Sequence, residues 1–134
     1  MRHVVGALLE QPASTTVLDM EAGVEHLSRG TGRHVDTLLV TLEPYYKALE
    51  TARRSAELGR EVGIPRVAGV ANKTRDADDR AAIREFAARH DLPLIGEIPF
   101  DERIQKADLA GRAAIDAADS PAIVAIGALA AALG

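Results

Sequence analysis

Short runs of apolar residues alternate along the chain with segments whose apolar positions repeat at helical spacing. Four runs predict strands, at 15–19, 36–42, 66–71 and 93–97. The run at 36–42, "DTLLVTL", is largely apolar and includes β-branched residues, which is typical of a strand buried on both faces. Strands separated by helices predict an α/β fold with a parallel sheet and right-handed crossovers.

Three segments have the features of helices that pack against such a sheet. A helix over about 45–62 begins next to Pro44 and ends at Gly63. A second helix, over 75–91, opens with acidic residues, which favour a helix N-terminus, and then repeats its apolar positions at helical spacing. A third begins with Ser120 as its N-cap. Two further helical segments are predicted at 3–10 and 101–109.

Composition narrows the class of protein. A chain of 134 residues suits a single domain, 1–134, with one core. Its net charge of −4 argues against a nucleic-acid or anionic-membrane surface, and the absence of cysteine excludes disulfides and thiolate metal sites within the chain. The C-terminal apolar run is shorter than the roughly 20 residues that span a bilayer. Since the N-terminus lacks a convincing signal peptide, we expect a cytoplasmic protein.

In open parallel sheets, ligands bind outside the carboxyl ends of the strands. The residues that follow the four predicted strands are therefore the candidates for a functional site. These segments are 19–23, 43–44, 72–74 and 98–101.

Asp19 closes the first predicted strand, as the acid of a Walker B motif does. Its carboxylate would hold a water of Mg²⁺, because Mg²⁺ keeps several waters and binds few protein oxygens. Gly23, four residues later, would let a backbone N–H approach a γ-phosphate. The alternative is that Asp19 caps the next helix and Gly23 only eases a turn.

Asn72 and Lys73 follow the third predicted strand. A side-chain amide offers both a donor and an acceptor to an adenine edge, and the lysine stem would pack along the ring. A guanine-reading motif would continue N-K-x-D, whereas the acid here arrives only at Asp76, which favours adenine. The alternative is that Asn72 is a turn residue.

Pro99, Phe100 and Asp101 follow the fourth predicted strand. They would line the other side of the nucleotide base. The alternative is a plain loop in which Asp101 caps the helix that follows.

Four stretches in this order carry a family resemblance. They are "VLDMEAGVEHLSRGTGRHVD", "LLVTLEPYYKALETA", "GVANK" and "IGEIPFDERIQKADLAGR". They resemble the CooC-type ATPases, accessory proteins for nickel insertion into carbon monoxide dehydrogenase within the MinD/ParA-like deviant P-loop NTPases. The signature D-M-E-A-G-x-E-H-L-x-R-G is quite specific to that branch, and the resemblance covers about residues 3–115.

The resemblance implies binding of ATP or ADP with Mg²⁺, and hydrolysis in a homodimer. Asp19 corresponds to the Walker B acid, which would bind Mg²⁺ through water, and Gly23 to the switch II glycine. Asn72 corresponds to the adenine-binding asparagine, and Pro99, Phe100 and Asp101 correspond to the loop that lines the base.

The chain departs from this family in one respect. No G-x-x-x-x-G-K-[ST] motif occurs in it, so the backbone cradle, lysine and Ser/Thr that hold phosphates and Mg²⁺ are missing. The family's nickel-binding Cys-x-Cys is missing too. We therefore expect the C-terminal half of a CooC-like ATPase, with a partial three-layer P-loop NTPase fold of about four strands that lacks the P-loop strand.

Three functions remain open at this point. The chain is an ATPase half that is inactive alone and acts in a homodimer or with a P-loop-bearing partner on a client such as carbon monoxide dehydrogenase; or it is a non-catalytic interaction module; or it is a remnant. Because the missing strand would lie between 15–19 and 36–42, we expect one of three arrangements. The two strands pair directly, the segment 15–19 stays loosely attached, or another chain fills the gap.

Overall fold

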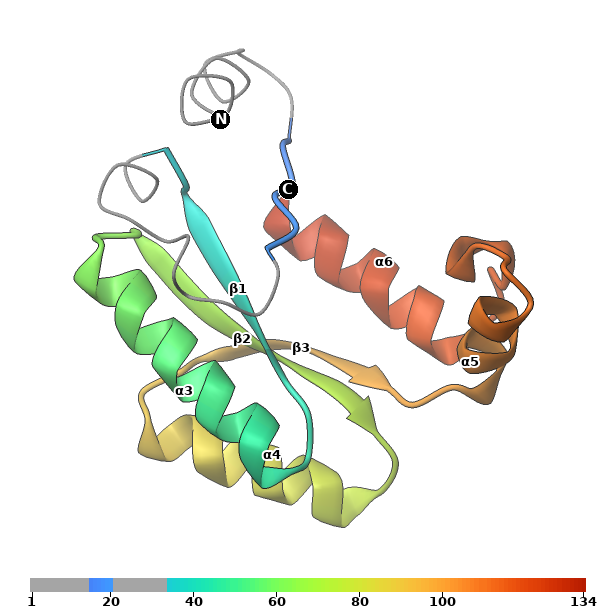
Figure 1. The fold of residues 1–134 in the computed structure, drawn as a ribbon, viewed down its shortest axis with the longest axis horizontal. Coiled ribbons are helices and arrows are strands. Elements are labelled where there is room, and N and C mark those ends of the chain that lie inside the picture. Colours follow the sequence, from blue (N-terminus) through green and yellow to red (C-terminus); the bar gives the residue numbers. More distant parts are fainter. Residues whose placement is uncertain (1–14, 21–33) are drawn as a thin grey trace.

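A three-stranded parallel sheet lies at the centre of the fold in the computed structural model, which describes residues 15–20 and 34–134. The strands are β1 (Thr37–Leu42), β2 (Arg66–Thr74) and β3 (Leu94–Pro99), and β2 lies between the other two (Figure 1). Parallel strands cannot be joined by tight hairpins, so each connection crosses a face of the sheet as a helix.

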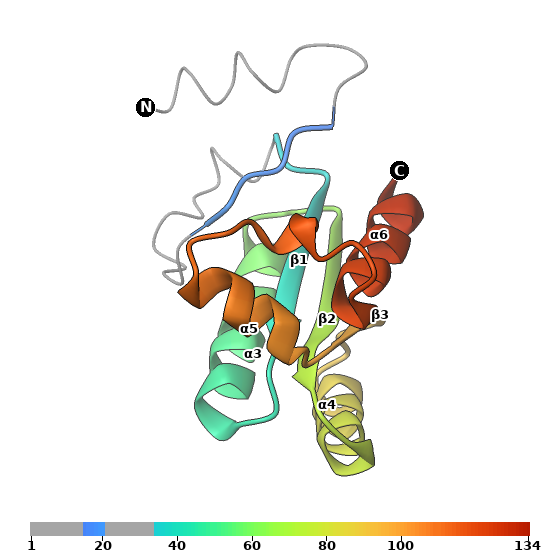
Figure 2. The same ribbon diagram turned by 90° about the vertical axis from the view of Figure 1, so that its right-hand side faces the viewer.

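Helices cover both faces of this sheet. Figure 1 shows α3 (Tyr46–Glu61) and α4 (Ala77–Arg89) on one side and α6 (Pro121–Leu133) on the other. The helix α5 (Glu102–Leu109) and the 3-10 turn η2 (Ala114–Asp116) lie on the same side as α6, as Figure 2 shows from a second direction. The predicted three-layer α/β class is confirmed. No helix in the described part of the chain has the length and apolar character needed to cross a bilayer.

The main core lies between the sheet and the helices α3 and α4. Leu42 of β1 and Ile83 of α4 are fully buried there, and each such side chain contributes roughly 1.5–3 kcal/mol through the area that it removes from water. Ala52 and Ala56 give α3 a buried face of small residues, which lets the helix lie close to β1.

Local capping fixes where two of the helices begin. The backbone N–H of Asp79 donates to the Asp76 carboxylate at 2.9 Å, and the N–H of Arg75 donates back to Asp79 at 2.9 Å. This reciprocal pattern satisfies N–H groups that a helix start leaves unpaired. The predicted N-cap of α6 is confirmed, since the N–H of Ile123 donates to the Ser120 hydroxyl at 3.4 Å.

The predicted strand at 15–19 is wrong. Residues 15–20 form no regular structure, and Val17 is 85% exposed. The physical reason is pairing: an apolar run becomes a strand only beside a neighbour, and within the described residues β1 pairs with β2 alone. Of the three expected arrangements, the loosely attached segment agrees with the structure. The predicted helix at 3–10 lies outside the described residues.

Candidate functional site

The carboxyl end of β2 carries two of the predicted site residues. The strand runs to Thr74, further than the predicted 66–71, so Asn72 lies in a strand and not in a turn. Lys73 has a φ of 57°, and the pairing of β2 with β3 shifts register between Asn72 and Thr74. The left-handed region costs a residue with a side chain roughly 1–2 kcal/mol, so other contacts must hold this bulge in place.

Glu43, which follows β1, supplies such contacts. Its Oε1 atom lies 2.9 Å from the Nζ atom of Lys73 and accepts a hydrogen bond of 3.3 Å from the Nδ2 atom of Asn72. The Glu43 side chain is 18% exposed, whereas that of Lys73 is 58% exposed. The glutamate therefore lies inside the cluster and the lysine covers it from the solvent side.

Opposing effects set the pKa of Glu43. Burial raises this pKa, but hydrogen bonds from Lys73, Tyr45 and Asn72, together with the charge of Lys73, lower it by more. The net result is a pKa below the ordinary glutamate value. Glu43 is therefore ionised at neutral pH, and an ionised carboxylate can only accept hydrogen bonds.

The carboxyl end of β3 lies directly beside the end of β2. The register places Pro99 opposite Thr74, and the N–H of Phe100 donates to the Thr74 carbonyl at 2.9 Å. The Arg75 guanidinium lies over the Phe100 ring, 4.4 Å from its centroid, in the geometry of a cation–π contact. The structure thus brings the predicted pairs 72–73 and 99–100 to one edge of the sheet.

The Asp101 carboxylate is engaged within the fold. It accepts a hydrogen bond of 2.6 Å from the Ser120 hydroxyl and one of 2.8 Å from the backbone N–H of Arg103, which makes it the N-cap of α5. The Ser120 hydrogen bond, followed by that from Arg103, lowers the pKa of Asp101. The side chain is only 9% exposed, so Asp101 positions the loop that contains Phe100 and offers little free carboxylate to a ligand.

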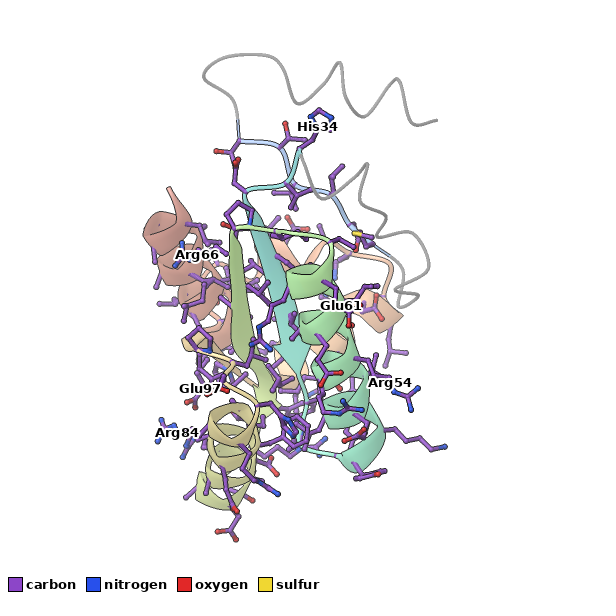
Figure 3. The ribbon with its side chains drawn as sticks, turned by 90° about the vertical axis from the view of Figure 1, so that its left-hand side faces the viewer. His34, Arg54, Glu61, Arg66, Arg84 and Glu97 are labelled. Carbon is purple, nitrogen blue, oxygen red and sulfur yellow. The ribbon has the colours of Figure 1, made fainter. Side chains whose placement is uncertain are left out.

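A second cluster near this edge was missed by the sequence analysis. Glu97 of β3 accepts a hydrogen bond from the Thr74 hydroxyl at 3.3 Å and forms ion pairs with Arg80 and Arg84 of α4, at 3.5 and 3.4 Å. Figure 3 shows Arg84 and Glu97 side by side where α4 passes β3. The only sequence signal was the four-residue spacing of the two arginines, which places them on one helix face. A hollow of about 280 Å³ lies here, lined in part by these three charged residues.

The predicted roles of Asp19 and Gly23 stay predictions. Asp19 is exposed, and no hydrogen bond or ion pair joins it to another residue of 15–20 or 34–134. Gly23 lies outside the described residues.

The described residues alone form no ready-made cluster for a metal ion. Mg²⁺ takes near-octahedral oxygen coordination, usually from one or two carboxylates together with a nucleotide's phosphates. Nowhere in 15–20 and 34–134 do three or more acidic or histidine side chains form a group that could hold a metal. The P-loop Ser/Thr that would share the ion is absent from the sequence.

Comparison with curated proteins identifies relatives. The chain is 38% identical over 116 residues to the carbon monoxide dehydrogenase accessory protein CooC of Rhodospirillum rubrum, an alignment that covers 87% of this chain and 43% of that protein. This similarity is consistent with a part of a CooC-type, MinD/ParA-like P-loop NTPase. An uncharacterized ATP-binding protein of Methanocaldococcus jannaschii is 32% identical over 112 residues, covering 84% of this chain and 44% of that protein. The chain thus spans less than half the length of these relatives. No protein-family model matches it.

Solved structures place this chain in the MinD/ParA-like fold. The MinD cell division protein of Aquifex aeolicus superposes with a TM-score of 0.68 at 19% identity, covering 83% of this chain and 49% of that one. A ParA family ATPase from Chlorobium tepidum gives a TM-score of 0.64 at 23% identity, covering 83% of this chain and 46% of that one. At these identities the likeness concerns the fold, and it confirms a partial P-loop NTPase architecture.

Proposed function

We propose that the chain provides the adenine-binding side of an ATP site in a CooC-like ATPase. The observation that carries this proposal is the amide of Asn72, held at the carboxyl end of β2 beside the Pro99–Phe100 segment. An amide has the donor and the acceptor that an adenine edge requires, and ligands of such sheets lie at this edge. A relative named as an ATP-binding protein supports the same proposal.

The phosphate-binding side of the site would come from outside these 134 residues. We propose that a P-loop is supplied by a partner chain or by the remainder of a longer protein, in a homodimeric assembly. The relative named as a carbon monoxide dehydrogenase accessory protein supports a role in nickel insertion into that enzyme. The roles predicted for Asp19 and Gly23, and Mg²⁺ itself, belong to such a completed site.

The isolated chain is expected to bind ATP weakly and without turnover. Most of the catalysis in phosphoryl transfer comes from positioned charges around the phosphates, which this chain lacks. A dissociation constant in the millimolar range corresponds to about −4 kcal/mol, a reasonable total for base contacts alone. Titration of ¹⁵N-labelled protein with ATP, followed by NMR, is expected to shift the side-chain amide of Asn72, the only asparagine in the chain.

Asn72→Ala is expected to weaken this binding at least several-fold, because it removes the base-reading amide. Gln105→Ala is the matched control, since it removes an exposed side-chain amide from α5. Equal ATP affinity in Asn72→Ala and the wild type, or no response of the wild type at all, would refute the proposed site. ATP hydrolysis by the pure chain that is lost in Asp19→Ala would refute the need for an external P-loop.

A further inference from the structure

The contact between Glu43 and Asn72 fixes both the position and the orientation of the Asn72 amide. The two residues come from neighbouring strand ends, 29 positions apart in sequence. Lys73 binds the same Oε1 atom of Glu43 at 2.9 Å, so the carboxylate is held from a second direction. With its side chain only 18% exposed, Glu43 has limited freedom to turn toward water instead.

This contact allows the Asn72 amide one orientation. Because the carboxylate accepts and never donates, the Nδ2 end of the amide must face it. The opposite orientation would place the carbonyl oxygen of Asn72 against a negative charge. The contact uses one of the two N–H groups, and among the described residues the other N–H and the Oδ1 atom make no hydrogen bond.

We propose that Glu43 is a positioning residue that makes this site selective for adenine over 6-oxopurines. The inference rests on the proposed function, because it takes Asn72 to be the residue that reads the base. Adenine presents a donor at N6 beside an acceptor at N7, and the fixed Oδ1 and N–H of Asn72 match this pair. A 6-oxopurine presents O6 and N7, both acceptors, so its O6 would face the amide oxygen.

Titrations of the full chain with ATP and with inosine triphosphate test this selectivity. Inosine triphosphate differs from ATP in carrying O6 and a protonated N1 in place of the N6 amine, so the phosphates contribute equally. A matched pair of base contacts discriminates by about 1–3 kcal/mol, so the wild type is expected to bind ATP about tenfold more tightly. The side-chain amide signals of Asn72 provide the readout.

Glu43→Gln is expected to bring the two affinities within about twofold of each other. Glutamine has almost the same size, but its amide both donates and accepts, so Asn72 can face it in either orientation. A purely structural weakening would lower both affinities by the same factor and leave their ratio unchanged. Glu57→Gln, which removes an exposed carboxylate paired with Arg53 on α3, is the control and is expected to keep the wild-type ratio.

Two results would overturn this inference while the proposed function stands. One is a wild-type chain that binds both nucleotides equally, a measurement that needs no variant. The other is a folded Glu43→Gln protein, verified by its amide spectrum, that keeps the tenfold preference. If neither nucleotide shifts the Asn72 signals of the wild type, the proposed function fails and this inference falls with it.

Discussion

Glu43 shows how a residue without an evident motif can organise a site. The sequence analysis placed it at a strand end but gave it no role, because its partners become its neighbours only through the pairing of β1 with β2. The ion pair with Lys73 also holds a lysine whose backbone lies in the left-handed region. One carboxylate thereby stabilises a strained bulge and the candidate base-reading amide.

The lowered pKa of Glu43 predicts a pH-dependent contribution to stability. Its folded-state pKa lies below the ordinary value of 4.5, so the contribution is full above pH 4.5 and is lost as the pH falls through the folded-state pKa. Glu43→Gln is expected to lower the free energy of unfolding at pH 7 by about 1 kcal/mol, and by less at pH 3. Urea unfolding at the two pH values measures this difference.

Glu85→Gln is the control for this measurement. Glu85 is 74% exposed and lies 3.6 Å from Arg89 on the same helix, an exposed pair of small energetic value. A loss of stability in Glu43→Gln that is the same at both pH values would contradict the assigned role of the carboxylate.

At the scale of elements, a close approach of side chains across the sheet depends on a glycine. A Cβ atom at Gly69 of β2 would lie 2.9 Å from the Leu42 Cδ1 atom and 2.9 Å from the Leu94 Cδ2 atom. Leu42 is fully buried and has little room to move. Leucines of β1 and β3 therefore pack over a position of β2 that has no side chain.

Gly69→Ala is expected to lower the free energy of unfolding by roughly 1–3 kcal/mol, because it overpacks a filled core. Gly127→Ala is its counterpart in α6, where a Cβ atom would meet nothing within 4 Å. There the substitution is expected to raise stability by about 0.5–1 kcal/mol, since alanine favours a helix interior over glycine. Chemical denaturation of both variants checks the pair, and destabilisation by Gly127→Ala equal to that by Gly69→Ala would contradict the packing argument.

The elements that were predicted correctly are those whose signals are local. The strands near 36–42, 66–71 and 93–97 and the N-cap Ser120 follow from apolar runs and capping residues within a few positions. The strand predicted at 15–19 failed because a strand needs a neighbour that a local pattern cannot supply. The bulge at Lys73 had no signal either, since the left-handed region is usually taken by glycine and not by lysine.

At the scale of the whole molecule, the segment 15–20 provides a test of how much of the chain forms the sheet. Its exposed, irregular backbone predicts that its amide protons exchange with solvent at nearly unprotected rates. The amide of Val70, in the central strand β2, is expected to be among the most protected. Native-state hydrogen exchange followed by NMR measures both. Protection of Val17 similar to that of Val70 would show that the segment pairs in the sheet after all.

Both the fold and the coverage of the relatives support the proposal that another part of the protein or a partner chain completes the site. The chain matches 43% of CooC and superposes on 49% of MinD, and β1 lacks a second neighbour within the described residues. In the proposed assembly, a P-loop strand supplied from outside these residues would add to β1, on the side away from β2.

The hydrogen bond between Asp101 and Ser120 affects how the molecule unfolds. It joins two points 19 residues apart, and the segment between them contains α5 and η2. This segment is thus clasped at its two ends by the Asp101–Ser120 contact and by the Arg103–Asp119 ion pair at 3.0 Å, and none of its residues belongs to the main core. When the clasp opens, the segment can unfold as a cooperative unit of its own while the sheet persists.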